Sequence, residues 1–302
     1  MKIVSVILTT YNSRDSVKRL VDSILKQKGI ESQFSIELIV IDDCSTDDTL
    51  DILSNYNIKI LTTTTNSGGP NKGRNIGLGV CTGDYICIAD HDDVWLDDKI
   101  ISSLQYLEEV PIVSSGYSLV NKTSGKRTER VANTTNSFIY YGKNETFLSK
   151  LVRSNTKQGA YLGSLIFRKD LKHIFFEENF GMVDFDWILR LFYQNDSIEL
   201  AASKYVRYID DINLSLKENY RRNDFYYSLM FIENYRGQFP REFNKAYKRI
   251  HGSRARYYYL IDNMQLARFY LRKAELSLKN VAYFLTSFYG SEYVKRKFNI
   301  FG

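Results

Sequence analysis

The chain has 302 residues, which is enough for one large domain, or for a domain with an appendage, and for a full-sized core. No stretch approaches the roughly twenty apolar residues that span a bilayer, and residues 1–12 lack the features of a secretion signal, so we expect neither a membrane-spanning nor a secreted protein. The three cysteines lack metal-type spacing and fit a reducing cytosol. The net charge of +6 is modest but uneven, because Lys and Arg outnumber Asp and Glu from Arg241 onward.

Strand and helix patterns alternate along the first half of the chain. Short apolar runs predict four strands that are covered on both faces, over residues 3–8, 38–41, 58–61 and 85–89. Apolar residues at helical spacing predict a helix over 17–25, and Pro70 marks the expected start of another. Strands that alternate with helices in this way predict right-handed crossovers and a parallel sheet.

The fourth predicted strand ends in an acidic tract that contains Asp90, Asp92 and Asp93. Three carboxylates so close together repel one another unless a cation shares them. Hard divalent ions such as Mg²⁺ or Mn²⁺ bind carboxylate oxygens together with substrate phosphates. The tract therefore predicts a metal site that holds a phosphorylated substrate. The alternative is an acidic turn that caps the following helix.

Polar residues follow all four predicted strands, at 9–12, 42–43, 66–69 and 90–93. Because the carboxyl ends of parallel strands lie at one edge of a sheet, we expect these groups to converge on a single crevice. Their chemistry is complementary to a nucleotide: carboxylates accept hydrogen bonds from base N–H groups and ribose hydroxyls, Tyr11 can stack on a base, and Arg74 can bind a phosphate or orient a carboxylate.

Four tracts carry a resemblance to a known family. They are residues 6–12 (VILTTYN), 40–47 (VIDDCSTD), 73–77 (GRNIG) and 90–95 (DHDDVW). In this order and spacing they resemble glycosyltransferase family 2, from residue 3 to about residue 215. The resemblance implies an inverting sugar transferase of α/β class, with the GT-A fold: a Rossmann-like mixed sheet.

The resemblance also implies a role for each matching residue. A nucleotide-sugar donor would bind at the strand ends, with Mn²⁺ or Mg²⁺ bridging its diphosphate. Asp43 would accept from the imide N–H of a uracil or thymine, and Asp92 would bind the metal. The family usually has Gly where this chain has Cys44, a departure that we expect to alter only a turn. The residues implied to bind the nucleotide are Thr9, Tyr11 and Asp43 at the base and ribose, Arg74 as their support, and Asp90 near the ribose.

In members of the family, the second half of the domain holds the general base and a further metal ligand. At the start of a predicted helix, this chain has Val183 where the family has Glu and keeps Asp184, which the resemblance makes the base. Asp186 is the competing base, although it should point elsewhere on the helix. Where many relatives supply a metal-binding His, this chain has none. Asp210 or Asp211 can replace it, or the segment is a solvated turn.

His91, within the acidic tract, is interpreted as a spacer rather than a ligand. Residues 1–215 are expected to form the glycosyltransferase domain, with a nucleotide-sugar half over 1–120 and an acceptor half over 121–215. Residues 216–302 are expected to form a C-terminal α-helical extension.

Apolar spacing predicts one helix over 260–274 and another over 282–288 in that extension. Two interpretations of the extension stay open. Its helices pack on the core or on a second copy of the chain, or they present a basic, aromatic surface to an anionic membrane or a lipid-diphosphate acceptor. Nucleic acid is not an expected partner, because no recognition motif accompanies the charge.

The sequence thus predicts an inverting, metal-dependent glycosyltransferase that moves a sugar from a UDP- or dTDP-sugar to a hydroxyl of a growing glycan, in the synthesis of bacterial surface polysaccharide. We expect a cytoplasmic location, or a peripheral one at the inner face of the membrane. One alternative is a sugar nucleotidyltransferase, which would need a Gly-rich basic loop that residues 9–14 do not provide. Another is an inactive module that binds a nucleotide or sugar.

Overall fold

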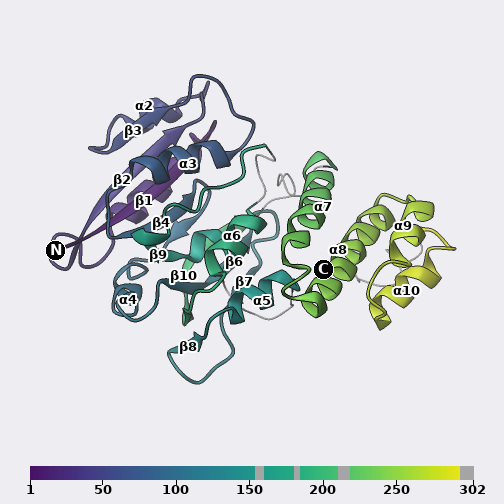
Figure 1. The fold of residues 1–302 in the computed structure, drawn as a ribbon. Helices are drawn as coiled ribbons and strands as arrows, with labels where there is room; N and C mark the ends of the chain where they lie inside the picture. The colour runs from purple at the N-terminus through teal and green to yellow at the C-terminus, as the bar shows by residue number, and fades with distance from the viewer. Residues whose placement is uncertain (154–159, 180–183, 210–217, 293–302) are drawn as a thin grey trace. The chain divides into compact units, whose positions relative to one another are not determined.

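The computed structural model describes residues 1–153, 160–179, 184–209 and 218–292 (Figure 1). Two compact units divide the chain: the first comprises Met1–Phe147 and Asn155–Asn213, and the second comprises Leu148–Ser154 and Leu214–Gly302. Val183, Asp210 and Asp211, to which the sequence assigned places near the base and the metal, lie outside the described residues.

A mixed β-sheet forms the centre of the first unit. In the part of the chain that the structure describes it has ten strands, and the main path runs in the order β3-β2-β1-β4-β9-β6-β10-β5. The strands are β1 (Lys2–Thr10), β2 (Phe34–Asp42), β3 (Lys59–Thr62), β4 (Tyr85–Asp90), β5 (Val94–Trp95), β6 (Ile112–Asn121), β7 (Arg127–Arg130), β8 (Phe138–Tyr141), β9 (Ile166–Arg168) and β10 (Ser197–Ile209). The helices up to residue 192 are α1 (Val17–Leu25), α2 (Thr49–Leu53), α3 (Pro70–Val80), α4 (Ile101–Leu104), α5 (Glu145–Leu151) and α6 (Phe185–Phe192).

The four predicted strands pair in parallel, as expected from the alternation of strands and helices. The register aligns their carboxyl ends: Thr9 lies beside Asp90, Thr10 beside Asp42, and Asp42 beside Thr62. The antiparallel strand β9 then joins this parallel half to β6 and β10. The polar residues that follow β1, β2, β3 and β4 therefore meet at one edge of the sheet.

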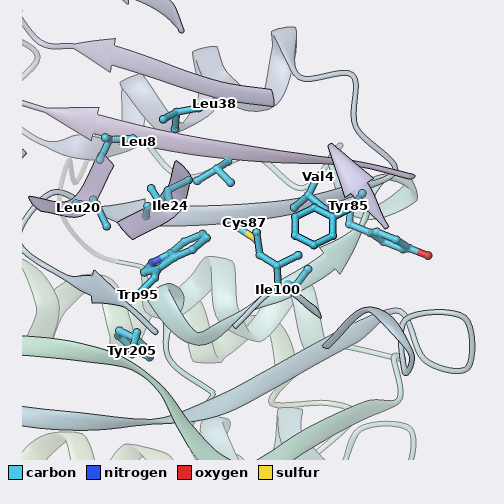
Figure 2. Close-up of a cluster of buried hydrophobic side chains, with 14 of the residues drawn as sticks. Val4, Leu8, Leu20, Ile24, Leu38, Tyr85, Cys87, Trp95, Ile100 and Tyr205 are labelled. Carbon is cyan, nitrogen blue, oxygen red and sulfur yellow. The ribbon is translucent and has the colours of Figure 1, made fainter. Parts of the chain in front are cut away.

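Helices cover both faces of the parallel half, which explains why its strands are almost continuously apolar. On one face, Val4, Val6 and Leu8 of β1 pack in a buried cluster with the apolar stripe of α1. Figure 2 shows Leu20 and Ile24 of α1 in this cluster with residues from β1, β2 and β4.

Helix α3 covers the opposite face and approaches it closely. A Cβ at Gly77 would lie 2.3 Å from Ile7 Cγ2, and one at Gly73 would lie 2.8 Å from Thr9 Cγ2. Two glycines four residues apart thus let the helix backbone rest directly on β1. This close packing fixes the position of Arg74, which follows Gly73 on the same helix.

The second unit contains the helices α7 (Glu218–Ile232), α8 (Pro240–Leu260), α9 (Met264–Leu271) and α10 (Leu278–Thr286). A small core of buried residues joins the last three, namely Ala255, Tyr259, Ala267, Leu271 and Tyr283. Among the described residues, no helix has both the length and the apolar character needed to cross a bilayer.

The predicted continuous helix over 260–274 is wrong. Helix α8 ends at Leu260, Asp262 adopts a left-handed conformation (φ 62°), and Asn263 caps α9 by accepting from Leu266 N–H at 3.2 Å. Leu260 and Ile261, which begin the apolar pattern, are 39% and 52% exposed, so the pattern there does not mark a buried helix face. In the predicted helix over 282–288, the apolar residues Leu285 and Phe288 are exposed rather than buried.

Candidate active site

Asp42, at the end of β2, has a structural role at the edge of the sheet where the polar residues meet. It is fully buried and accepts hydrogen bonds from Thr10 Oγ1 at 2.8 Å, Ser45 N at 2.8 Å and Ser45 Oγ at 2.6 Å. Burial of a polar side chain is costly unless the group is hydrogen-bonded. These bonds fasten the loop after β2 to the end of β1.

Asp43 is held as a fixed hydrogen-bond acceptor. Its carboxylate accepts from Thr63 Oγ1 at 2.8 Å, Ser67 N at 2.9 Å and Ser67 Oγ at 2.9 Å, and the residue is buried. Cys44 next to it has φ 62°, in the left-handed region. The family's usual Gly adopts that conformation without steric cost. The replacement of Gly by Cys at this position therefore affects a turn.

Thr9 and Tyr11 differ in their exposure at this edge. Thr9 is buried under α3, whereas the Tyr11 ring is 48% exposed. The loop that carries Tyr11 is tied to the loop after β2, because Thr46 N donates to Asn12 Oδ1 at 2.8 Å and Asn12 N donates to Ser45 Oγ at 2.9 Å. An exposed ring on an anchored loop is suited to stacking on a flat ligand.

The acidic tract divides into side chains with different surroundings. Asp93 is buried, and desolvation, followed by the charge of Asp90, raises its pKa well above the usual range. The His91 ring lies 3.1 Å from Ser16 Oγ, at the start of α1. Asp92 is half-buried, and its carboxylate accepts no hydrogen bond from any residue that the structure describes.

The surroundings of Asp92 fit a divalent cation. The described residues contain no group of three or more His, Cys, Asp or Glu side chains able to enclose a metal. Mg²⁺, however, is commonly held by one or two carboxylates together with water and substrate phosphates, rather than by a cage made only of protein. A half-buried carboxylate without a hydrogen-bond donor among the described residues suits that coordination, and Asp92 is such a group.

Arg74 links helix α3 to the end of β4. The guanidinium is almost buried, and it donates from Nη2 to Asp90 Oδ1 at 2.9 Å and from Nη1 to Asn71 Oδ1 at 3.0 Å. The Phe176 ring lies 5.2 Å from its Cζ, and Phe176 in turn stacks on Trp187 of α6 at 4.4 Å. This stack connects the nucleotide half to the helix that carries the predicted base.

Asp184 immediately precedes α6, at the helix N-cap, and its side chain makes no capping hydrogen bond. Desolvation raises the pKa of its carboxyl, the charge of Asp90 raises it further, and the charges of Arg74 and Arg207 lower it. The carboxyl is therefore within electrostatic reach of the edge that carries Asp90. The structure brings the predicted base and the predicted nucleotide residues together.

Asp186, the competing base, is in a different environment. It is buried and forms an ion pair with Arg190 Nη2 at 2.6 Å, one turn further along α6. Arg190 also donates to the carbonyl of Phe175 at 2.7 Å. This pairing gives Asp186 a structural role in holding α6 against the segment before it.

Arg207 is a site residue that the sequence reasoning did not find. Its guanidinium lies 5.6 Å from the Tyr117 ring and 5.8 Å from the Tyr161 ring, and its charge acts on Asp90, Asp93 and Asp184. It lies on β10, directly after the buried Val206, and is itself half-buried. A charged residue inside a partly buried strand was the available signal.

The chain is similar to known proteins in sequence and in fold. A family model described as glycosyl transferase family 2 matches residues 5–175. The poly(ribitol-phosphate) β-N-acetylglucosaminyltransferase TarS of Staphylococcus aureus is 38% identical over 109 residues, which are 35% of this chain and 19% of TarS. The Escherichia coli β-1,3-glucosyltransferase WfaP, whose name gives UDP-Glc as donor and α-D-GlcNAc-diphosphoundecaprenol as acceptor, is 34% identical over 110 residues, which are 36% of this chain and 42% of WfaP.

Each of these matches spans less than half the length of the relative. Among solved structures, S. aureus TarS 1–349 in complex with UDP aligns with a TM-score of 0.59 at 19% identity, over 98% of this chain and 92% of that one. The likeness establishes a GT-A fold, as the sequence predicted.

Proposed function

The chain belongs to glycosyl transferase family 2, and on that premise we propose that it transfers a sugar from a UDP- or dTDP-sugar to a hydroxyl of a growing glycan, with inversion at the anomeric carbon. The glycan is a bacterial surface polysaccharide. In support, both relatives named above are glycosyltransferases; the name of one gives poly(ribitol-phosphate), and the name of the other gives a diphosphoundecaprenol acceptor.

The observation that carries the proposal is the electrostatic interaction of two carboxylates from different halves of the first unit. Asp90 ends β4, Asp184 immediately precedes α6, and the charges of Asp90, Arg74 and Arg207 all act on Asp184. An inverting transfer needs the leaving diphosphate and the base on opposite faces of one sugar ring, and we assign the donor to the Asp90 side and the base to Asp184.

On the donor side, Asp43 would accept from the imide N–H of the pyrimidine, and Tyr11 would stack on the base. The hydrogen bonds from Thr63 and Ser67 fix the Asp43 carboxylate before any ligand arrives, which lowers the entropic cost of recognition. Thr9 and Asp90 would lie near the ribose, with Arg74 holding the Asp90 carboxylate in place.

Asp92 would hold Mn²⁺ or Mg²⁺. When bound, such a cation neutralises charge that develops on a leaving nucleoside diphosphate. Arg207 would add a fixed positive charge on the same side, since it acts on both Asp90 and Asp93 and lies on the rigid strand β10.

On the acceptor side, Asp184 would take the proton from the attacking hydroxyl. The hydroxyl oxygen forms the new bond to the anomeric carbon while the bond to the diphosphate breaks, and the O–H proton passes to the carboxylate. Burial raises the pKa of Asp184 towards neutrality, which improves a carboxylate as a general base. Asp186 is less suited, because Arg190 already occupies it.

We also propose a cytoplasmic protein whose second unit contacts a membrane surface or a second copy of the chain. The specific support is apolar exposure on α10 and its flanks: Leu278 is 92% exposed, Phe288 64% and Tyr289 76%. Exposed apolar side chains mark an interaction site where they form one contiguous patch. The basic residues of the same region favour an anionic membrane.

A screen of nucleotide sugars tests the proposed function. Release of nucleoside diphosphate and transfer to a glycan acceptor are measured with UDP-, dTDP- and GDP-sugars, with Mn²⁺ or Mg²⁺ and with chelator. We expect cation-dependent turnover of a UDP- or dTDP-sugar that Asp184→Asn abolishes. Nucleotide binding without turnover of any donor would instead indicate an inactive binding module, and pyrophosphate release from a nucleoside triphosphate and a sugar phosphate would indicate a nucleotidyltransferase.

A further inference from the structure

A small cavity in the second unit gathers positive charge that the proposed transfer does not use. It lies between α7 and α8, has a volume of about 20 Å³, and is lined by Arg221 and Asp224 of α7, Ser253, Arg254 and Tyr257 of α8, and Arg153. A cavity needs about 10–15 Å³ to hold one water molecule, so this cavity has room for one oxygen of a larger ligand. The lining residues recur three or four positions apart, which places them on the facing sides of the two helices.

Arg254 is the most deeply placed of these cations. Only 5% of it is exposed, and its Nη2 donates to the Tyr258 hydroxyl at 2.8 Å. Its Nε and Nη1 are buried and have no acceptor among the described residues. The rings of Phe225, Tyr257 and Tyr258 lie 4.5–5.6 Å from its Cζ, but a ring face supplies no lone pair for an N–H in the guanidinium plane.

The other two arginines are held differently. Arg153 pairs with Asp224 at 3.3 Å, and Arg249 Nη1 fixes its backbone by donating to the carbonyls of Val152 at 2.9 Å and Arg153 at 3.2 Å. Arg221 is half-buried and forms no hydrogen bond or ion pair within the described ranges. Its donors therefore remain within reach of a ligand.

Among the described residues, acidic groups do not balance this charge. Asp224 is shared between Arg153 and the Ser228 hydroxyl, and Glu218 acts on Tyr257 from the exposed first turn of α7. Nearby, burial and the positive charge of Arg221 lower the pKa of Arg256. Uncompensated buried cations are costly in a protein interior, so the cavity favours an anion.

We propose that this cavity binds a phosphoryl group, such as a phosphomonoester or phosphodiester of an acceptor or a lipid. Arg221 and Ser253 donate directly to its oxygens, and Arg254 supplies the buried charge beneath them. Guanidinium groups match a tetrahedral anion with several parallel N–H donors, which is why arginine clusters select phosphate. The site lies wholly within the second unit and does not depend on the donor chemistry of the first.

Side-chain NMR of the arginine Nε–Hε groups tests the site directly in the full chain, without divalent cations. Inorganic phosphate is titrated against chloride at constant ionic strength, and the Arg254 and Arg221 signals are assigned by their loss in Arg254→Lys and Arg221→Gln. We expect saturable shifts of both signals. In Arg221→Gln, the Kd followed on Arg254 should rise about tenfold or more, since a charged hydrogen bond contributes about 1.5–3 kcal/mol.

The matched control is Arg222→Gln, which removes the same charge from the adjacent exposed position of α7. It should leave the phosphate Kd unchanged. A second arm replaces phosphate with vesicles of phosphatidic acid: tighter binding there than to soluble glycerol phosphate, with the same dependence on Arg221, assigns the group to a lipid, and equal binding assigns it to a soluble or polymer phosphate. If neither probe moves the Arg254 signal, or if Arg221→Gln and Arg222→Gln weaken binding equally, the proposal is overturned.

Discussion

Arg74 and Asp90 form an ion pair, with Nη2 and Oδ1 2.9 Å apart, that joins helix α3 to the last residue of β4. The arginine side chain is almost buried and the carboxylate is one-third exposed. The pair therefore holds a carboxylate in a fixed position at the edge of the sheet, instead of leaving an arginine free for phosphate. Of the two roles that the sequence left open for Arg74, the structure favours the orientation of a carboxylate.

The first prediction concerns the general base. Asp184→Asn should lower turnover by about 10²–10⁴, because the amide cannot take the proton from the attacking hydroxyl. Donor affinity should be nearly unchanged. Asp186→Asn should retain most turnover but lose about 1–3 kcal/mol of unfolding free energy, because it breaks the ion pair with Arg190. Steady-state kinetics and urea denaturation measure the two effects. The opposite ranking of the two variants in turnover would make Asp186 the base.

The raised pKa of Asp184 predicts that Asp184→Asn loses turnover without losing stability. A carboxyl whose folded-state pKa is raised is harder to ionise in the folded protein than in the unfolded chain. Ionised Asp184 therefore lowers stability at neutral pH, and this penalty disappears as the pH falls below the unfolded pKa. We expect Asp184→Asn to be at least as stable as the wild type at pH 7, measured by thermal unfolding.

A second prediction concerns pH dependence. Turnover requires ionised Asp184, so the acidic limb of the kcat profile should have its midpoint above about 3.9, the ordinary value for Asp. The charge of Arg207 lowers the pKa of Asp184, and Arg207→Gln should move the limb to higher pH. An acidic limb that does not respond to this variant would separate Arg207 from the base.

The third prediction addresses the metal. Asp92→Asn should abolish transfer without unfolding the protein, and excess chelator should do the same to the wild type. Asp97→Asn is the matched control, because Asp97 lies nearby in the chain and its exposed carboxylate pairs with Lys28 at 2.9 Å. Cation dependence is measured as turnover against Mn²⁺ concentration. Full activity of Asp92→Asn, or full activity in chelator, would remove Asp92 from the metal site.

The fourth prediction is that Asp43 selects a pyrimidine. A site built to hydrogen-bond one group rejects an analogue that lacks it by roughly 10⁴-fold, because its polar atoms stay unpaired. Calorimetry with Mn²⁺ should show binding of UDP or dTDP and none of GDP. Asp43→Asn should weaken UDP binding, and Asp51→Asn, at an exposed position of α2, should not. Preferential binding of GDP would refute the assignment.

The fifth prediction distinguishes the two partners proposed for the second unit. The double variant Leu278→Asp and Leu285→Asp changes exposed side chains and should leave the fold intact. If the surface contacts a membrane, the wild type should bind anionic vesicles less as salt rises, and the variant should bind them weakly at all salt concentrations. Light scattering is the second readout. A dimer that the variant converts to monomer, without vesicle binding, would identify the surface as a homodimer contact.

The sequence by itself determined the strands of the parallel half of the sheet and the polar residues at its edge. The four strands, the start of α3 at Pro70 and the polar groups after each strand were all predicted correctly. These features depend on local patterning and on burial of both strand faces, which a single sequence records directly. The fold class followed, because parallel strands joined by helices allow few topologies.

Tertiary structure alone decided which charged groups act on one another. The pairing of Arg74 with Asp90, and the action of the Arg207 charge on Asp184, depend on contacts between distant elements. The break between α8 and α9 was missed because Leu260 and Ile261 continue the apolar spacing through it although both side chains are exposed. Periodicity reports which face of an element is buried, whereas the partner of a buried charge is fixed only when the chain has folded.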